Sequence, residues 1–329
     1  MGVRATVMGA GAWGTAFAMI LAEAGNEVTL WARRPEVAEG INTTGRNPDY
    51  LRDTDLPGVI ATADPDAALA GAEIVVLAVP SQQLRANLAG WTMPSEAIVV
   101  SLAKGIEVGT LHTMGQVVNE HGVFRDRITV VSGPNLADEI AARQPATTVV
   151  AGWDRAVAEQ VGAVCRTPWF RPYTSIDVIG CEIAGATKNA IALAVGMGIG
   201  RGFGANSMAS LITRGLAEST RLGESLGADP HTFAGLAGMG DLVATCMSPL
   251  SRNRSFGEHL GRGLSVAEAT TASRGVAEGV RSSSSILALA RRQDVEMPIV
   301  ERVVQVLSGE LSPDDAIRTL MARETKPER

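Results

Sequence analysis

Cysteine, histidine and aromatic residues are all scarce in this chain. Its 329 residues include three cysteines, Cys165, Cys181 and Cys246, which form neither a Cys-x-x-Cys pair nor a zinc-ligand pattern. We therefore expect reduced thiols buried in the core. The four histidines are scattered without ligand spacing, so no metal site is predicted.

The chain also lacks a net positive charge and any long apolar run. A formal net charge of −6 argues against general binding of nucleic acid, so an anionic substrate needs a local basic cluster. No apolar run is long and uninterrupted enough to span a membrane. No signal peptide precedes the first expected strand, which makes the cytoplasm the expected location. The length predicts two domains.

A glycine-rich turn stands near the N-terminus. A strand is expected over residues 3–8, and Gly9, Gly11 and Gly14 follow it in a Gly-x-Gly-x-x-Gly pattern. An Ala-rich helix over 15–24 and a strand over 27–31 complete the unit in which this motif binds a dinucleotide. Such glycines let a pyrophosphate approach bare backbone at a helix N-terminus, where free N–H groups attract anions. The alternative is a packing turn.

Strand-length apolar runs alternate with helical segments through the first half. Further strands are expected at 59–61, 74–79, 97–102, 128–131, 147–151 and 170–174. Near-continuous apolar runs suit strands buried on both faces, so we predict an α/β fold with a Rossmann-type, doubly wound, mainly parallel sheet. From about residue 176 helical spacing takes over, with helices expected at 182–195, around 211–226, from 298 and from 313. The predicted domains are an NAD(P)-binding domain over 1–177 and an all-helical substrate-binding domain over 178–329.

The end of the second strand predicts the cofactor. An acidic residue there would accept hydrogen bonds from a ribose 2′-hydroxyl, whereas a basic residue accommodates a 2′-phosphate. Here the strand runs into Arg33 and Arg34, and guanidinium groups pair well with phosphate. We therefore predict NADPH, with NADH as a second cofactor. Two solvated arginines are the alternative. Trp13, inside the glycine turn, either flanks the cofactor or packs under the turn.

Reduction of a carbonyl by hydride needs an acid and a group that stabilises the oxyanion. Lys188 is the leading candidate, because it lies among small apolar residues where burial lowers the pKa of an ammonium. A lysine that extends to the surface is the alternative. Lys104 follows a buried strand, at the edge of the sheet where ligands bind, and is a second candidate cation. A plain loop lysine is the alternative. Asp241, in a glycine turn, caps a helix, pairs with Lys188 or accepts a substrate hydroxyl.

The run from Ser251 to Ser255 gathers two guanidiniums, an amide and two hydroxyls. Such groups suit a phosphate, which takes bidentate arginine and several donors. A solvated basic loop is the alternative.

Together these segments resemble one family, the bacterial NAD(P)-dependent sn-glycerol-3-phosphate dehydrogenases. The resemblance covers nearly the whole chain in order. It is carried by GAGAWGTA at 9–16, AVPS at 78–81, SLAKGIE at 101–107, SGP at 132–134 with Ala137 and Glu139, KN at 188–189, LITRGLAE at 211–218, GDL at 240–242 and SRNR at 251–254. The last three blocks are specific, whereas many dehydrogenases share the glycine turn.

The resemblance implies reversible reduction of dihydroxyacetone phosphate to sn-glycerol 3-phosphate, the backbone precursor of phospholipids. It implies that Lys188 gives and takes the proton. The implied substrate contacts are Lys104, Gly133, Lys188, Asp241, Ser251, Arg252 and Asn253. The implied cofactor contacts are Gly9, Gly11, Ala12, Trp13, Gly14, Arg33, Arg34, Tyr50, Lys104, Ala137, Arg252, Val276 and Glu278. A helical domain like that of 6-phosphogluconate dehydrogenases and a homodimer are also implied.

The chain departs from the family pattern at two places. Ala205 and Met208 replace an acid and a lysine in a Gly-Asp-Asn-Thr-Lys segment, and Asn135 replaces a serine. The first departure bears on substrate affinity or control by product. Rival interpretations are a 3-hydroxyacid dehydrogenase of the 6-phosphogluconate type and a nucleotide-sensing regulator without turnover. The basic cluster favours a phosphate substrate, and the presence of Lys188 favours turnover.

Overall fold

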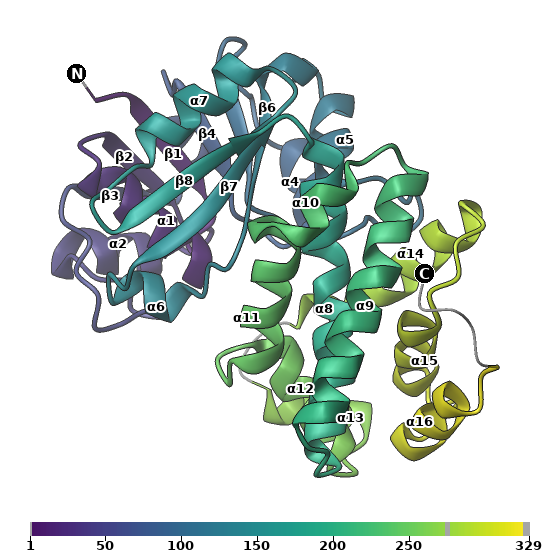
Figure 1. The fold of residues 1–329 in the computed structure, drawn as a ribbon. Coiled ribbons are helices and arrows are strands. Elements are labelled where there is room, and N and C mark those ends of the chain that lie inside the picture. The colour runs from purple at the N-terminus through teal and green to yellow at the C-terminus, as the bar shows by residue number, and fades with distance from the viewer. Residues whose placement is uncertain (1, 274–276, 325–329) are drawn as a thin grey trace.

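Eight strands form one sheet in the first half of the chain (Figure 1). The computed structural model describes residues 2–273 and 277–324. The strand order is β3-β2-β1-β4-β5-β6-β7-β8, and all neighbours are parallel except β6 and β7. The strands are β1 (Arg4–Met8), β2 (Glu27–Trp31), β3 (Val59–Thr62), β4 (Ile74–Leu77), β5 (Ile98–Ser101), β6 (Ile128–Ser132), β7 (Ala146–Gly152) and β8 (Phe170–Ser175).

Every expected strand is present, and the Rossmann-type prediction is confirmed. The central strands β4 and β5 are buried along their whole length, as their apolar runs predict. Three strands are shorter than expected: β1 begins at Arg4, β4 ends at Leu77, and β5 spans only Ile98–Ser101. The chain leaves β4 ahead of Pro80, which has no N–H for a ladder, and enters a 3₁₀ turn at Ser81–Gln83.

The glycine turn makes the chain reverse tightly between β1 and the first helix. The helices of this half are α1 (Ala12–Glu23), α2 (Pro35–Thr44), α3 (Pro65–Leu69), α4 (Leu84–Leu88), α5 (Met114–Glu120), α6 (Ala137–Ala141) and α7 (Arg155–Val164). Helix α1 begins three residues before the expected start, directly after Gly11. A Cβ at Gly9 would lie 2.6 Å from Ala78 O, and one at Gly14 would lie 1.9 Å from Gly9 O. Gly11 faces open space, so backbone is left bare there.

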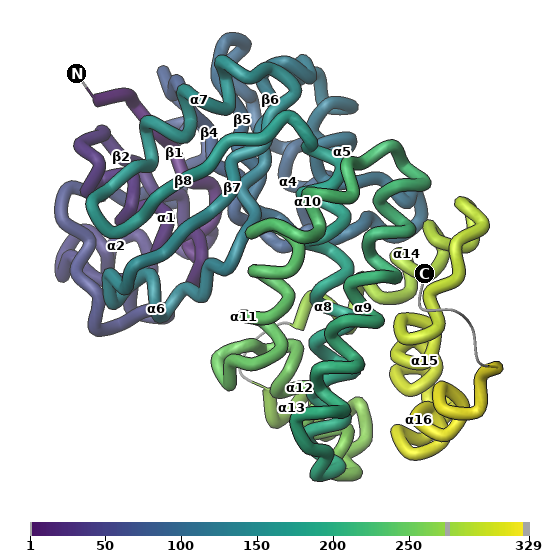
Figure 2. Tube along the Cα trace, in the orientation of Figure 1, coloured from purple at the N-terminus to yellow at the C-terminus, as the bar shows by residue number. Residues whose placement is uncertain are grey.

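The second half is helical, as predicted, and is built around α8 (Figures 1 and 2). Its helices are α8 (Val178–Gly200), α9 (Ala205–Ser225), α10 (Pro230–Ala234), α11 (Asp241–Met247), α12 (Arg252–Gly261), α13 (Val266–Ala272), α14 (Glu278–Arg292), α15 (Pro298–Leu307) and α16 (Pro313–Met321). A π-helical turn, Leu236–Gly240, precedes α11. The run of serines at 282–285 lies within α14, and Ser312 caps α16 by accepting from Asp315 N at 3.1 Å.

Helix α8 is longer and more apolar than expected. It spans 23 residues, and by length and composition it is the one described helix that could cross a membrane. That result differs from the sequence-based expectation. However, 89% of the apolar window is buried inside the structure, with α9, α11, α12 and α14 packed around it, so α8 is the core helix of the helical half. The three cysteines are buried and unpaired, and burial raises the pKa of each thiol.

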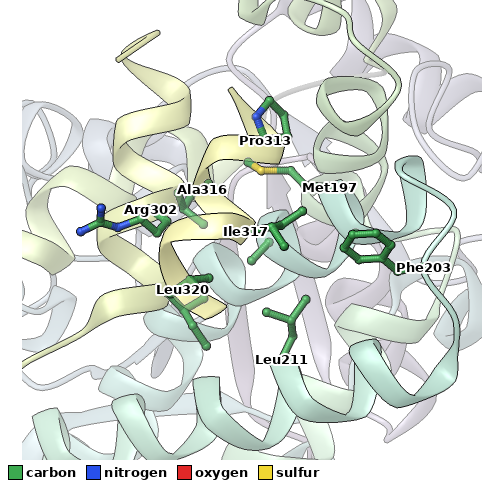
Figure 3. A pocket seen from close by; sticks show the side chains of 12 residues that line it. Met197, Phe203, Leu211, Arg302, Pro313, Ala316, Ile317 and Leu320 are labelled. Carbon is green, nitrogen blue, oxygen red and sulfur yellow. The ribbon is translucent and has the colours of Figure 1, made fainter. Parts of the chain in front are cut away.

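The last helix, α16, packs on α15 and faces the far end of α8. Between them lies a small apolar pocket lined by Met197, Phe203, Leu211 and Ile317 (Figure 3). Met208 is buried beside this pocket. Its Cε packs against Gly198 of α8, since a Cβ at Gly198 would lie only 2.6 Å from it. Gly198 is ten residues from Lys188, or about 15 Å along the helix axis at 1.5 Å per residue. The Met208 departure therefore fills apolar space well away from that lysine.

Helices α8 and α12 touch backbone to backbone. A Cβ at Gly196 would lie 2.0 Å from Arg254 O, and one at Gly257 would lie 2.1 Å from Leu193 O. Gly200 and Gly261 repeat the pattern one turn further on, with gaps of 2.3 and 2.2 Å to the facing carbonyl oxygens. No side chain fits in this seam. It brings the first turn of α12, with the basic cluster, against the middle of α8.

Gly257→Ala should therefore destabilise the protein by about 1–3 kcal/mol, because the added methyl overpacks a seam that has no room to adjust. Urea unfolding would measure the change. Gly90→Ala is the matched control, since its Cβ would meet only Asn87 O, at an ordinary 3.6 Å, and it should unfold close to the wild-type midpoint. If Gly257→Ala unfolded at the wild-type urea concentration, this description of the packing would be wrong.

Candidate active site

The helical half meets the sheet near the ends of β5, β6 and β8. A buried cluster of Val130, Ala151, Val178, Cys181 and Ala237 joins the two halves across this boundary. Helix α8 starts directly after β8, and Asp177 caps it by accepting from Gly180 N at 2.9 Å. The segments that follow β5 and β6 are thereby held close to the middle of α8.

One carboxylate bridges two lysines at this boundary. Asp241 Oδ1 lies 2.5 Å from Lys188 Nζ, and its Oδ2 lies 2.6 Å from Lys104 Nζ. Lys188 also donates to Thr245 Oγ1 at 2.7 Å, and Lys104 approaches Gly133 O at 3.4 Å. These groups come from α8, α11 and the segments after β5 and β6. The structure thus gathers four of the predicted site residues into one cluster.

Burial controls the ionisation of this cluster. It lowers the pKa of Lys188 to about 8, while Asp241 raises that pKa and Lys104 lowers it further. Burial also raises the pKa of Asp241, but the two ammonium groups outweigh it and hold the pKa below its usual range. An ammonium with a pKa near neutrality can give up a proton and take it back. The cluster can therefore act as an acid or a base.

The structure decides several of the alternatives for these residues. Lys188 is buried and does not extend to the surface. Lys104 is no plain loop lysine, since its side chain is only 15% exposed. Asp241 opens α11 without capping it, so of the three expected roles the pairing with Lys188 is observed. In the π-helical turn before Asp241, the backbone of Gly238 lies close to that of Phe233, since a Cβ at Gly238 would lie 2.2 Å from Phe233 O. Such turns are frequent at functional sites.

The predicted phosphate-binding residues occupy the first turn of α12. Ser251 caps this helix by accepting from Arg254 N at 3.3 Å, and Arg252 is exposed. Asn253 is buried, donates to Asn189 Oδ1 and accepts from Gly279 N, both at 2.9 Å. Asn253 therefore ties three helices together, and the helix N-terminus beside it adds partial positive charge.

The predicted cofactor-binding residues of the sheet half follow the ends of β1, β2 and β6. Arg33, Arg34 and Tyr50 are exposed beyond the end of β2. Trp13 packs against the core, with its ring edge-to-face on Phe17 at 5.5 Å, so it lies at least partly under the turn. Ala12 begins α1 and Ala137 begins α6.

Glu278 and Asn135 each link two segments near the ends of the strands. Glu278 is half-buried and accepts from Ser81 N at 3.2 Å, which links α14 to the end of β4. Asn135 donates to Thr148 Oγ1 at 2.8 Å and so ties the segment after β6 to β7. Val276 lies outside the described residues.

Sequence reasoning missed Thr245 and Asn189. Thr245 stands four residues after Asp241, and that spacing on one helix face was a signal that could have found it. Asn189 follows Lys188 directly, but nothing local indicates that its amide would meet Asn253 on another helix. Thr245 accepts a hydrogen bond from the ammonium of Lys188, and Asn189 accepts one from the amide of Asn253.

Comparison with known proteins matches the chain along most of its length. The family model for the N-terminus of NAD-dependent glycerol-3-phosphate dehydrogenase matches residues 4–158, and the model for the C-terminus matches residues 177–318. A glycerol-3-phosphate dehydrogenase (NAD(P)+) of Nocardia farcinica is 59% identical, covering 99% of both chains. One of Streptomyces griseus is 57% identical over 99% of this chain and 98% of its own.

Solved structures agree. The glycerol-3-phosphate dehydrogenase of Coxiella burnetii is 34% identical with a TM-score of 0.93, covering 98% of this chain and 99% of that one. A ketopantoate reductase of Ralstonia eutropha, at 18% identity with a TM-score of 0.60, covers 95% of this chain and 99% of its own and shares the fold alone.

Asp241→Asn should lower the free energy of unfolding by about 3–5 kcal/mol, because it leaves two buried ammonium groups without a counter-ion. Lys188→Met should cost much less, since Asp241 keeps Lys104 as its partner. Urea unfolding of both variants at neutral pH would measure the difference. Equal losses would contradict the bridging role of Asp241.

Proposed function

This chain belongs to the family of NAD-dependent glycerol-3-phosphate dehydrogenases, and we propose that Lys188 gives the proton in its reaction. The reaction is the reversible, NAD(P)H-dependent reduction of dihydroxyacetone phosphate to sn-glycerol 3-phosphate. The observation that carries the proposal is the buried ammonium of Lys188, hydrogen-bonded to Asp241 and Thr245, with its pKa near 8.

The glycine turn suits a dinucleotide. Gly9 and Gly14 leave no room for side chains, and Gly11 exposes bare backbone at the start of α1, where N–H groups attract a pyrophosphate. When bound, the reduced nicotinamide supplies the hydride. We assign the other cofactor contacts to Ala12, Trp13, Arg33, Arg34, Tyr50, Lys104, Ala137, Arg252, Val276 and Glu278. NADPH is the favoured cofactor in this proposal, because β2 leads into two arginines.

The proton moves between Lys188 Nζ and the substrate oxygen. In reduction the carbonyl carbon gains hydride, and the oxygen takes a proton from the ammonium, which becomes a neutral amine. In oxidation the neutral amine takes the hydroxyl proton back. Asp241 orients Lys188 and favours its charged form, and Lys104 adds positive charge where the oxyanion develops.

The substrate phosphate binds at the first turn of α12 in this proposal. Arg252 supplies a guanidinium, Ser251 and Asn253 supply polar groups, and the helix N-terminus favours an anion. Gly133 and Lys104 lie on the sheet side of the substrate. This phosphate site is the reason to prefer a triose phosphate over a plain 3-hydroxyacid.

Three further features belong to the proposal. The chain divides into functional domains at residues 177 and 178, between β8 and α8. It works in the cytoplasm, a compartment that suits three buried, unpaired cysteines. It works as a homodimer, which rests on the family resemblance.

Lys188→Ala should lower kcat by about 10²–10³-fold, the loss of about 2.7–4 kcal/mol expected when a charge-assisted transition-state contact is removed. NADPH absorbance on addition of dihydroxyacetone phosphate would follow turnover. The dissociation constant of NADPH should stay near the wild-type value. Thr187→Val is the control, because that buried hydroxyl donates only to backbone of its own helix. Near-full activity of Lys188→Ala would refute the assignment.

The two directions of the reaction should depend on pH with opposite sign. Reduction needs the protonated amine, so its kcat/KM should fall as pH rises through about 8. Oxidation needs the neutral amine and should rise over the same range. Because the Asp241 carboxylate raises the pKa of Lys188, Asp241→Asn should move both midpoints to lower pH. Profiles that do not move in this variant would remove Lys188 as the titrating group.

A further inference from the structure

A carboxylate from a later segment lies at the end of β2, where the residues that directly follow the strand, Ala32 to Arg34, include no acid. Arg34, just beyond β2, forms an ion pair through Nη2 with Asp49 Oδ2. Asp49 comes from the segment after α2, so the pair exists only in the folded chain. Its side chain is 31% exposed and is accessible to a ligand. The structure thus supplies in space the acid whose absence predicts NADPH.

Asn47 fixes this carboxylate relative to the glycine turn. Asn47 is fully buried, and its Nδ2 donates to Ala10 O at 3.0 Å and to Thr15 Oγ1 at 2.8 Å. Its Oδ1 accepts from Asp49 N at 2.9 Å and from Tyr50 N at 3.2 Å. All of its hydrogen-bonding capacity is used. Asp49 and Tyr50 are therefore anchored to the turn rather than carried on a free loop.

The charges at this edge are unequal. Arg34 faces two carboxylates, because its Nε also lies 3.7 Å from Glu36 Oε1. Arg33 forms no ion pair within residues 2–273 and 277–324, so it is the guanidinium left for a phosphate. A carboxylate accepts hydrogen bonds from a ribose 2′-hydroxyl but repels a 2′-phosphate. The end of β2 therefore holds Asp49, which favours NADH, and Arg33, which favours NADPH.

We propose that Asp49 sets the cofactor selectivity of this enzyme: it binds the adenosine ribose of NADH and, by repulsion and by occupying Arg34, limits the preference for NADPH. This inference rests on the proposed binding of the cofactor at the glycine turn. Arg33 gives the opposing attraction for the 2′-phosphate. The balance between the two explains how one site accepts both cofactors.

The test is Asp49→Asn, assayed with NADPH and with NADH. The ratio of kcat/KM for NADPH to that for NADH should rise about tenfold, because one repulsion is removed and one hydrogen-bond acceptor for the ribose is weakened. Dissociation constants of both cofactors, measured by tryptophan fluorescence without substrate, should shift in the same ratio. The shift should shrink at high salt, since these side chains are partly exposed.

The matched control is Asp55→Asn. Asp55 pairs with Arg46 at 2.7 Å in the same segment of chain, so its loss changes the net charge equally but leaves Arg34 and Asp49 untouched. Its cofactor ratio should equal that of the wild type. A ratio in Asp49→Asn within twofold of the control, or an equal loss for both cofactors, would overturn the inference.

Two measurements separate this inference from the proposed function. If both cofactors bind with the shifted ratio but no dihydroxyacetone phosphate is reduced, the selectivity role stands and the proposed reaction fails. If the wild type turns over with an unshifted ratio in Asp49→Asn, the reaction stands and the selectivity role fails.

Discussion

The bridge from Asp241 to Lys188 and Lys104 is the interaction on which the rest of this structure depends. A buried carboxylate between two ammonium groups compensates the charge of the buried Lys188 and pairs with Lys104 as well. It joins α8, α11 and the segment after β5, so it also joins the sheet to the helices. The same contact that stabilises the boundary holds a lysine with its pKa near 8.

Other buried hydrogen bonds also cross this boundary. Glu182, on α8, accepts from Gly115 N of α5 at 2.7 Å, and burial raises its pKa to about 7. Ser285, on α14, donates to Ile106 O at 2.8 Å, two residues beyond Lys104. Each contact connects the helical half to a segment at the edge of the sheet. Several independent contacts therefore fix the position of Lys104 relative to Lys188.

Small residues make the arrangement possible. The glycines of α8 and α12 let two backbones touch, and this contact carries the basic first turn of α12 to within reach of Asn189. Larger residues would hold the helices further apart and separate the basic cluster from Lys188. The abundance of glycine and alanine is thus a requirement of the site as well as of the fold.

The sequence by itself determined what depends on near neighbours. The apolar strands, the turn at Gly9 to Gly14, the helical second half and the cap at Ser312 were all predicted, because each follows from periodicity or steric fit within a few residues. Lys188 and Lys104 were identified as candidates, with the family resemblance adding weight that their local sequence lacked.

Only the tertiary structure decided which distant groups meet. The antiparallel β7, the full length of α8, the choice of Lys188 as the partner of Asp241, the contact of Asn253 with Asn189 and the arrival of Asp49 at Arg34 all depend on it. The physical reason is that an ion pair or a buried amide leaves no local pattern in either partner. Its energy depends on burial and on a distance of a few ångströms, and packing of the whole chain sets both.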